Sequence, residues 1–176
     1  MLMRETPLPG VFVLDPEKKD DNRGFFARTW SPEDMIERGL DPHLAHCSIS
    51  FNHRAGTVRG MHFQTAPREE TKIVRCTRGA MFDVAIDLRP DSPTFKRWTA
   101  VELSATNHRA LYIPKGCAHG FQALMDATEV LYLISEPYDP ALARGVRWND
   151  PAFGVIWPLP LTEISKRDQD CPDFAG

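Results

Sequence analysis

Short runs of β-forming residues, separated by turn residues, are the feature that most limits how this chain can fold. The runs are rich in Val, Ile, Phe and Tyr, and Gly, Pro, Asn and Asp stand between them. They cover residues 10–14, 25–30, 45–51, 58–63, 72–76, 80–88, 98–103, 110–113, 120–124 and 129–135. Regular short strands without alternating helical segments are typical of a sandwich or barrel. The sequence therefore predicts an all-β fold.

Helical signals are confined to two short segments. Residues 31–39 begin with Ser31 as an N-cap, place Pro32 at the first helical position and end at Gly39. This pattern predicts one short surface helix. The polar tail at residues 165–170 is the other segment with a helical appearance.

The clearest alternation lies in residues 80–88. Four large apolar residues are interleaved with two acids and an alanine: Phe82, Val84, Ile86 and Leu88 with Asp83, Ala85 and Asp87. A period of two predicts a strand with one face in the core and the other in water.

Size and charge exclude several classes of protein. A chain of 176 residues fits a single domain, residues 1–176, with a core that needs no disulfide or metal. The net charge is −3 without a basic block, which argues against a nucleic-acid partner. We expect a cytoplasmic protein without a membrane partner, because no apolar run approaches the roughly 20 residues of a membrane helix and no signal peptide is recognisable. The four cysteines form no C-x-x-C pair.

The first candidate site residues lie in the segment TVRGMHFQ, residues 57–64. Arg59 and His62 differ by three, so strict strand alternation places them on opposite faces unless Gly60 introduces a bulge. A lone histidine is more often an ordinary hydrogen-bonded residue than a functional one. Whether His62 is functional therefore depends on the residues that surround it.

Further polar residues interrupt apolar strands or lie in the tail. Lys72 either reaches for solvent or projects into a cavity as a fixed positive charge. Tyr132 is the only aromatic hydroxyl in its strand, and it is either an amphipathic core tyrosine or a functional phenol. The tail at residues 161–168 either returns an acid to the core or lies in solvent.

The segment PKGCAHGFQ matches the P-x-G-x-x-H of the second cupin motif, in which a tight turn delivers a histidine, here His119, to an inward strand. Many cupins bind a metal through three histidines and a glutamate, and the first half-motif requires His-x-His. Here Gln64 stands two residues after His62. Glu69 or Glu70 offers a carboxylate, but the set lacks one imidazole. We therefore expect no metal and no cofactor.

Taken in order, these segments resemble the dTDP-4-dehydrorhamnose 3,5-epimerase family and its 3-epimerase and 5-epimerase relatives in deoxysugar pathways. The likeness covers nearly the whole chain. The matching segments are 21–26, 58–64, 72–76, 82–89, 92–95, 103–105, 113–121, 148–151 and 165–168. The resemblance implies a cupin-type jelly roll, or double-stranded β-helix, with a few short peripheral helices. It also implies a metal-free homodimer that binds a nucleotide sugar.

The resemblance assigns roles to individual residues. His62 is implied as the base, Asp168 as the carboxylate that orients it, Lys72 as the cation at the developing oxyanion and Tyr132 as the proton donor. The residues implied in substrate binding are Arg23, Arg28, His46, Ser48, Arg59, His119, Tyr138 and Arg167.

Epimerisation beside a ketone explains the need for these residue types. The proton on the neighbouring carbon can be removed only if the enolate is stabilised, which Lys72, helped by His119, would provide. A neutral imidazole accepts the proton, and inversion requires a second acid on the opposite face of the sugar. The expected reaction inverts carbon 3, carbon 5 or both of a nucleotide-linked 4-keto-6-deoxyhexose, for cell-surface polysaccharide or natural-product glycosides.

Departures from the family pattern fall among the ligand-binding residues. Arg28 replaces a glutamate that helps bind thymine, His46 and Ser48 replace glutamine and asparagine, and Ala143 stands at a commonly acidic position. Because Arg28 can only donate hydrogen bonds, it suits a base edge with acceptors, as in cytosine. Alternatively, Arg28 pairs with an acid of its own fold.

Three other functions remain open on the sequence. A ketoisomerase of the same fold would move the carbonyl through an enediol with the same base. A sugar-binding cupin without catalysis is the second alternative, and the joint presence of the four reaction residues argues against it. A metal-dependent oxygenase is the third, and this sequence lacks the set of metal ligands that such an enzyme requires.

Overall fold

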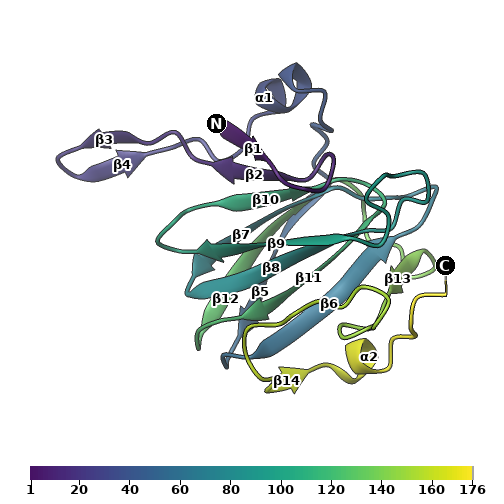
Figure 1. Cartoon of the computed structure of the whole chain (residues 1–176). Coiled ribbons are helices and arrows are strands. Elements are labelled where there is room, and N and C mark those ends of the chain that lie inside the picture. The colour runs from purple at the N-terminus through teal and green to yellow at the C-terminus, as the bar shows by residue number, and fades with distance from the viewer. Residues whose placement is uncertain (176) are drawn as a thin grey trace.

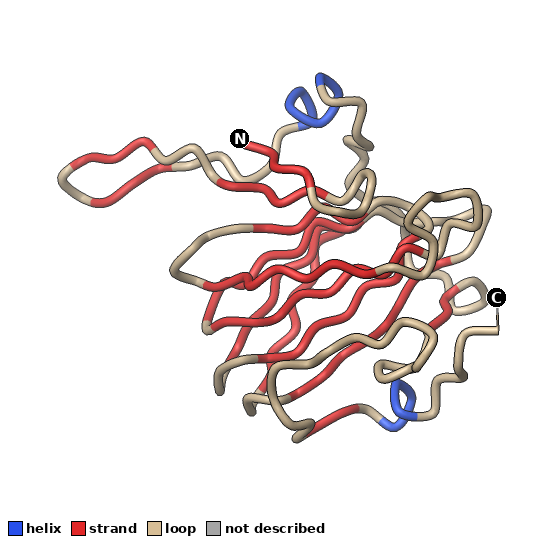
Figure 2. Tube along the Cα trace, viewed as in Figure 1, coloured by secondary structure: helices blue, strands red, loops and turns tan. Residues whose placement is uncertain are grey.

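Two large β-sheets pack face to face and enclose the main hydrophobic core (Figure 1, Figure 2). The computed structural model describes residues 1–175. The first sheet has the strand order β1 (Leu2–Glu5), β2 (Phe12–Asp15), β10 (Ala110–Ile113), β7 (Lys72–Arg78), β12 (Thr128–Ile134) and β5 (His46–Asn52). The second has the order β13 (Ala143–Gly145), β6 (Thr57–Gln64), β11 (Cys117–Ala123), β8 (Ala80–Asp87) and β9 (Trp98–Ser104), with β14 (Glu163–Ile164) paired to β6. The prediction of an all-β jelly roll is confirmed.

The strands follow the sequence prediction closely, with one shortened segment. Residues 25–30 were expected to be extended, but only β4 (Gly24–Phe26) forms, and residues 27–30 are not in a strand. It pairs with β3 (Lys19–Asp21) in a hairpin, which we call the arm, that projects away from the two sheets (Figure 1). The strands β1, β3, β13 and β14 were not predicted, because each has at most four residues and shows no clear run of β-forming side chains.

Both predicted helices are present, and each is capped by a serine. The helix α1 (Pro32–Glu37) begins after Ser31, whose hydroxyl accepts a hydrogen bond from the Asp34 amide at 3.4 Å. The helix α2 (Lys166–Gln169) begins after Ser165, whose hydroxyl accepts one from the Asp168 amide at 3.1 Å. In both cases the side chain satisfies an amide that has no partner within the helix.

The expectation that β8 has one face in water is wrong. Asp83 and Asp87 are 0% exposed, as are their apolar neighbours Val84 and Ile86. The face with the acids points between the two sheets, where Ala85 belongs to the main core. The opposite face is covered by C-terminal side chains, namely Phe153, Val155, Trp157 and Phe174. A chain segment far away in sequence therefore buries the second face, which local periodicity cannot reveal.

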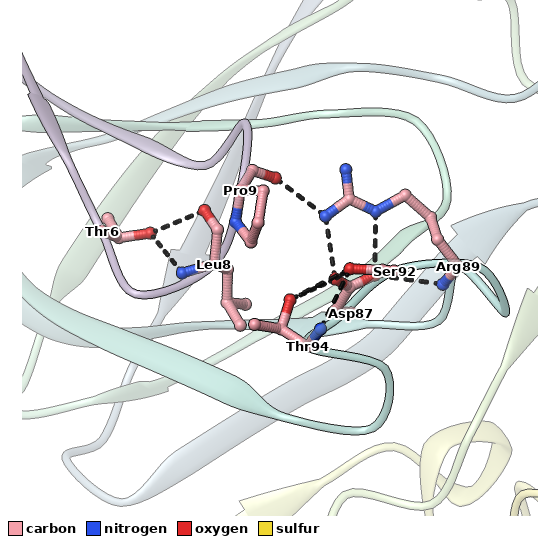
Figure 3. Close-up of polar contacts among 7 residues, drawn as sticks. All are labelled: Thr6, Leu8, Pro9, Asp87, Arg89, Ser92 and Thr94. Atoms are coloured by element: carbon pink, nitrogen blue, oxygen red, sulfur yellow. Dashed lines mark hydrogen bonds and ion pairs between the residues drawn. The ribbon is translucent and has the colours of Figure 1, made fainter.

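Asp87 anchors the turn between β8 and β9 through hydrogen bonds (Figure 3). Its carboxylate accepts from Arg89 Nε at 2.8 Å, from Ser92 Oγ at 2.5 Å and from Thr94 Oγ1 at 2.7 Å. Arg89 also donates to the Pro9 carbonyl at 2.8 Å, which ties the N-terminal loop to the second sheet. Burial alone would raise the pKa of Asp87, but these hydrogen bonds outweigh burial and hold the pKa well below its usual range.

We expect Asp87→Asn to lower the free energy of unfolding by about 3 kcal/mol at neutral pH, because it removes the buried partner of Arg89. The contribution of Asp87 should be complete above its unfolded-state pKa of about 3.9 and should disappear as the pH falls towards the lower folded-state pKa. Urea unfolding between neutral and acidic pH measures this: the variant should lose less stability on acidification than the parent. Asp91→Asn, at an exposed site in the same turn, is the matched control. Equal acid sensitivity of parent and Asp87→Asn would contradict the assignment.

Candidate active site

A cavity of about 320 Å³ lies between the two sheets and gathers most of the predicted site residues. The predicted residues that line it are His46, Ser48, Arg59, His62, Lys72, His119, Tyr132, Tyr138 and Arg167. They come from β5, β6, β7, β11, β12, α2 and the segment after β12. Residues up to 121 positions apart in sequence therefore share one site.

His62 and Asp168 form a close pair at one wall of the cavity. His62 Nε2 lies 2.7 Å from Asp168 Oδ1, and Asp168 Oδ2 accepts a hydrogen bond from the Gly60 amide at 3.2 Å. The acid thus returns from the C-terminal tail to the core. Burial would raise the pKa of Asp168, but the hydrogen bond and charge of His62 outweigh it and the pKa is lowered. An ionised carboxylate fixes the hydrogen of the imidazole on Nε2 and stabilises an imidazolium.

A bulge at Gly60 brings Arg59 and His62 to the same cavity. His119 on β11 pairs with His62 on β6, whereas Phe121 pairs with Arg59, so β6 has one residue more than β11 in this interval. A Cβ atom on Gly60 would lie 2.5 Å from Gly120 Cα, and Gly60 has a φ of 122°. Glycine is therefore required where the two backbones meet.

The sequence allowed Lys72 either to reach for solvent or to project into a cavity. In the structure it projects into the cavity. Its ammonium lies 2.8 Å from Glu70 Oε1 and donates to the His62 carbonyl at 3.3 Å. The charged end is therefore held beside His62 and not in bulk water.

Tyr132 faces the cavity from the first sheet, whereas His62 faces it from the second. The Tyr132 hydroxyl contacts Ser50 Oγ at 3.2 Å, and its ring lies edge-on to His119 with 6.1 Å between centroids. Burial raises the pKa of Tyr132, so the phenol keeps its proton at neutral pH. A protonated phenol from one sheet and an imidazole from the other thus line the same cavity.

His119 is paired with Asp83, a residue that sequence reasoning assigned to a solvent-facing side of its strand. His119 Nε2 lies 2.7 Å from Asp83 Oδ1, and both side chains are buried. Burial raises the pKa of Asp83 and outweighs the opposing effects of His119 and Lys72. The other carboxylate oxygen has no partner among residues 1–175. Asp83 was missed because its signal, an acid inside an alternating strand, is also that of an exposed face.

Gln64, at the place of a second metal-binding histidine, has a structural role. Its amide nitrogen donates to the carbonyls of Arg68 at 3.1 Å and Pro137 at 3.3 Å, and its oxygen accepts from the Asp139 amide at 2.7 Å. These contacts hold the loop before β7 and the segment that carries Tyr138. Within residues 1–175, no three His, Cys, Asp or Glu side chains lie close enough together to hold a metal ion.

Cationic side chains lie along the remaining cavity wall. Arg59 donates to Asn52 Oδ1 at 2.8 Å and to the Phe51 carbonyl at 3.1 Å. Arg167 donates to the Tyr138 hydroxyl at 3.3 Å, and both of these side chains are exposed. Guanidinium groups at this position suit the phosphates of a nucleotide.

Arg23 and Arg28 do not reach this cavity. Arg23 lies in the arm, where its side chain is 85% exposed and pairs with Asp21 at 2.7 Å. Arg28 follows the arm and lines a separate hollow with Glu17 and Asp34. The acids that line this hollow leave open the alternative in which Arg28 pairs within its own fold. The role of Arg28 at a nucleotide base stays a prediction.

No helix among residues 1–175 has the length and apolar character that crossing a bilayer requires.

Known proteins similar to this chain are sugar epimerases. Residues 5–176 match the family model described as dTDP-4-dehydrorhamnose 3,5-epimerase. A dTDP-4-dehydrorhamnose 3,5-epimerase of Sinorhizobium fredii is 39% identical over 175 residues, which cover 99% of this chain and 90% of the relative.

Solved structures give the same result for the fold. The dTDP-4-dehydrorhamnose 3,5-epimerase of Bacillus anthracis, solved with TDP and PPi bound, has a TM-score of 0.93 and 38% identity, covering 98% of this chain and 100% of that one. NovW, a 4-keto-6-deoxy sugar epimerase from the novobiocin cluster of Streptomyces spheroides, has a TM-score of 0.92 and 38% identity, covering 98% and 87%. The prediction of a cupin-type jelly roll is confirmed.

Proposed function

Because this chain belongs to the dTDP-4-dehydrorhamnose 3,5-epimerase family, we propose that it inverts carbon 3, carbon 5 or both of a dTDP-linked 4-keto-6-deoxyhexose. It is an isomerase-class enzyme, an epimerase. The observation that carries the assignment of roles is the placement of the His62–Asp168 pair on one sheet and Tyr132 on the other, across one cavity.

In this proposal His62 removes the proton beside the ketone. The electron pair of the broken C–H bond moves to the ketone oxygen, and Lys72 and His119 stabilise the resulting enolate. Asp168 stabilises the imidazolium. The enolate then collapses and takes a proton from the Tyr132 hydroxyl on the opposite face, which inverts the carbon. Proton exchange with solvent then returns the imidazolium of His62 and the tyrosinate of Tyr132 to their starting states. Overall, the product has the composition of the substrate, so no oxidant, reductant or cofactor is consumed.

The nucleotide occupies the cationic end of the cavity in this proposal. Arg59 and Arg167 bind the diphosphate, and the exposed ring of Tyr138 provides a surface on which the base can stack. Thymine is favoured because the relatives are enzymes of dTDP sugars. His46 and Ser48 line the same cavity, so their departure from the family pattern alters how the base is held and not the reacting groups.

A panel of dTDP-, CDP- and UDP-linked 4-keto-6-deoxyhexoses in heavy water tests the function. We expect inversion with deuterium at carbon 3, carbon 5 or both, and fastest with the dTDP sugar. NMR reads both the position of the deuterium and the configuration. Movement of the carbonyl would indicate the ketoisomerase, and the absence of both exchange and inversion across the panel would indicate a sugar-binding cupin.

The proposal includes a homodimer in which the arm reaches the partner. Phe26 on the arm is 73% exposed, and Ile49 and Phe51 on β5, an edge strand of the first sheet, are also exposed. Apolar surface of this kind suits burial against a second copy. Arg23 would then act at the partner's cavity, which accounts for its distance from its own. Sedimentation as a monomer at the concentrations used for assay would contradict this part.

We place the enzyme in the cytoplasm, in the synthesis of deoxysugars for surface polysaccharides or natural-product glycosides. The four free cysteines among the described residues suit a reducing compartment.

A further inference from the structure

A buried carboxylate accompanies the cation of the site. Glu70 and Lys72 both line the cavity, and their side chains are only 11% and 10% exposed. Glu70 Oε1 lies 2.8 Å from Lys72 Nζ. Glu70 lies two positions before Lys72, the first residue of β7, and both side chains reach the same cavity.

A lysine at this depth needs a fixed partner. An ammonium removed from water is costly unless it is paired and hydrogen-bonded, and a long lysine side chain otherwise turns towards solvent. The His62 carbonyl is neutral and accepts at 3.3 Å, so Glu70 is the charged partner. An ammonium has three N–H donors. With two engaged by these groups, the third remains for a ligand oxygen.

The backbone around Glu70 is held from both sides. The Thr71 amide donates to Ser135 Oγ at 2.8 Å, and the Ser135 amide donates to the Thr71 carbonyl at 3.1 Å. Gln64 holds the preceding loop through the Arg68 carbonyl. The carboxylate is therefore attached to a fixed frame, as an orienting group requires.

We propose that Glu70 is a positioning residue, which holds the Lys72 ammonium in place and directed at the ketone oxygen of the substrate. This inference rests on the proposed function of Lys72. Glu70 acts through Lys72. Its loss therefore impairs stabilisation of the enolate more than it impairs binding, so kcat decreases while KM changes little.

A double-mutant cycle on the full-length protein tests the proposal. Glu70→Gln keeps the shape of the side chain and removes its charge. We expect about a tenfold decrease in kcat, with a KM within about twofold of the parent, and the same decrease in the rate of deuterium exchange. In a Lys72→Met background, Glu70→Gln should change kcat by less than about twofold, because no ammonium is left to position.

Two further variants complete the design. Glu69→Gln changes the neighbouring acid, which does not line the cavity, and should retain parental kcat. Glu70→Asp keeps the charge on a shorter side chain and should recover part of the loss, which also provides a readout if Glu70→Gln folds poorly.

Several results would overturn the inference. They are a parental kcat in Glu70→Gln, an increase in KM at constant kcat, or an equal tenfold loss in the Lys72→Met background, which would mean that Glu70 acts independently. If Lys72→Met itself retains parental kcat, the proposed role of Lys72 fails together with the inference. If Lys72→Met is impaired and Glu70→Gln is not, the inference alone fails.

Discussion

His62→Asn is expected to lower both deuterium exchange and epimer formation by about 10³-fold, because both begin with removal of the carbon-bound proton. Asparagine occupies similar space but cannot accept this proton near neutral pH. The measurement is NMR in heavy water with the dTDP-linked 4-keto-6-deoxyhexose, with enough enzyme to detect the residual rate. Exchange and inversion should decrease together.

The control for His62→Asn is His43→Asn, at an exposed site outside the cavity, which should retain parental rates. Thermal melting of His62→Asn shows whether the fold is kept. A folded His62→Asn that still exchanges at a rate within tenfold of the parent would remove His62 from the role of base.

Tyr132→Phe is expected to slow inversion much more than deuterium exchange, whereas His62→Asn slows both together. The base and the cation remain, so exchange at the substrate carbon should stay within about tenfold of the parent. Delivery of a proton from the opposite face is lost, so inversion should decrease by about 10²-fold. The same NMR experiment gives both rates, from deuterium at the original configuration and from the new epimer.

Tyr112→Phe is the matched control for Tyr132→Phe. The Tyr112 hydroxyl is buried in the first sheet, where it accepts a hydrogen bond from the Asp41 amide at 3.3 Å, and it does not line the cavity. This substitution should leave both rates unchanged. If Tyr132→Phe forms the epimer at the parental rate, another group donates the proton, and the assignment of faces is wrong.

Local patterns in the sequence predict the strands and helices because their causes are local. Ser31 and Pro32 define the start of α1, and Gly60 permits the bulge that places Arg59 and His62 at one cavity. The two acids of β8 show the limit. They point between the two sheets, while a C-terminal segment packs on the opposite face of the strand, so both faces are buried and no pattern within the strand records these contacts.

The site itself was predicted largely through likeness to a family, and its supporting groups were not. Asp168 meets His62 across 106 positions of sequence, so no local pattern could pair them. Glu70 appeared only as a rejected metal ligand, and Asp83 as a solvent-facing acid, because the partner that explains each is known only from the fold. Arg23 shows the opposite case. It was predicted to bind the substrate, but it lies in the exposed arm and does not reach the cavity of its own chain.

The central claim is that the sugar ring lies between His62 and Tyr132, with its ketone at Lys72. A crystal structure of His62→Asn with the bound dTDP-linked 4-keto-6-deoxyhexose tests it most directly, because slow turnover preserves the substrate. We predict that the ring separates residue 62 from Tyr132 and that the ketone oxygen lies within hydrogen-bonding distance of Lys72 Nζ. A ketone directed away from Lys72, or residue 62 and Tyr132 on the same face of the ring, would contradict the account.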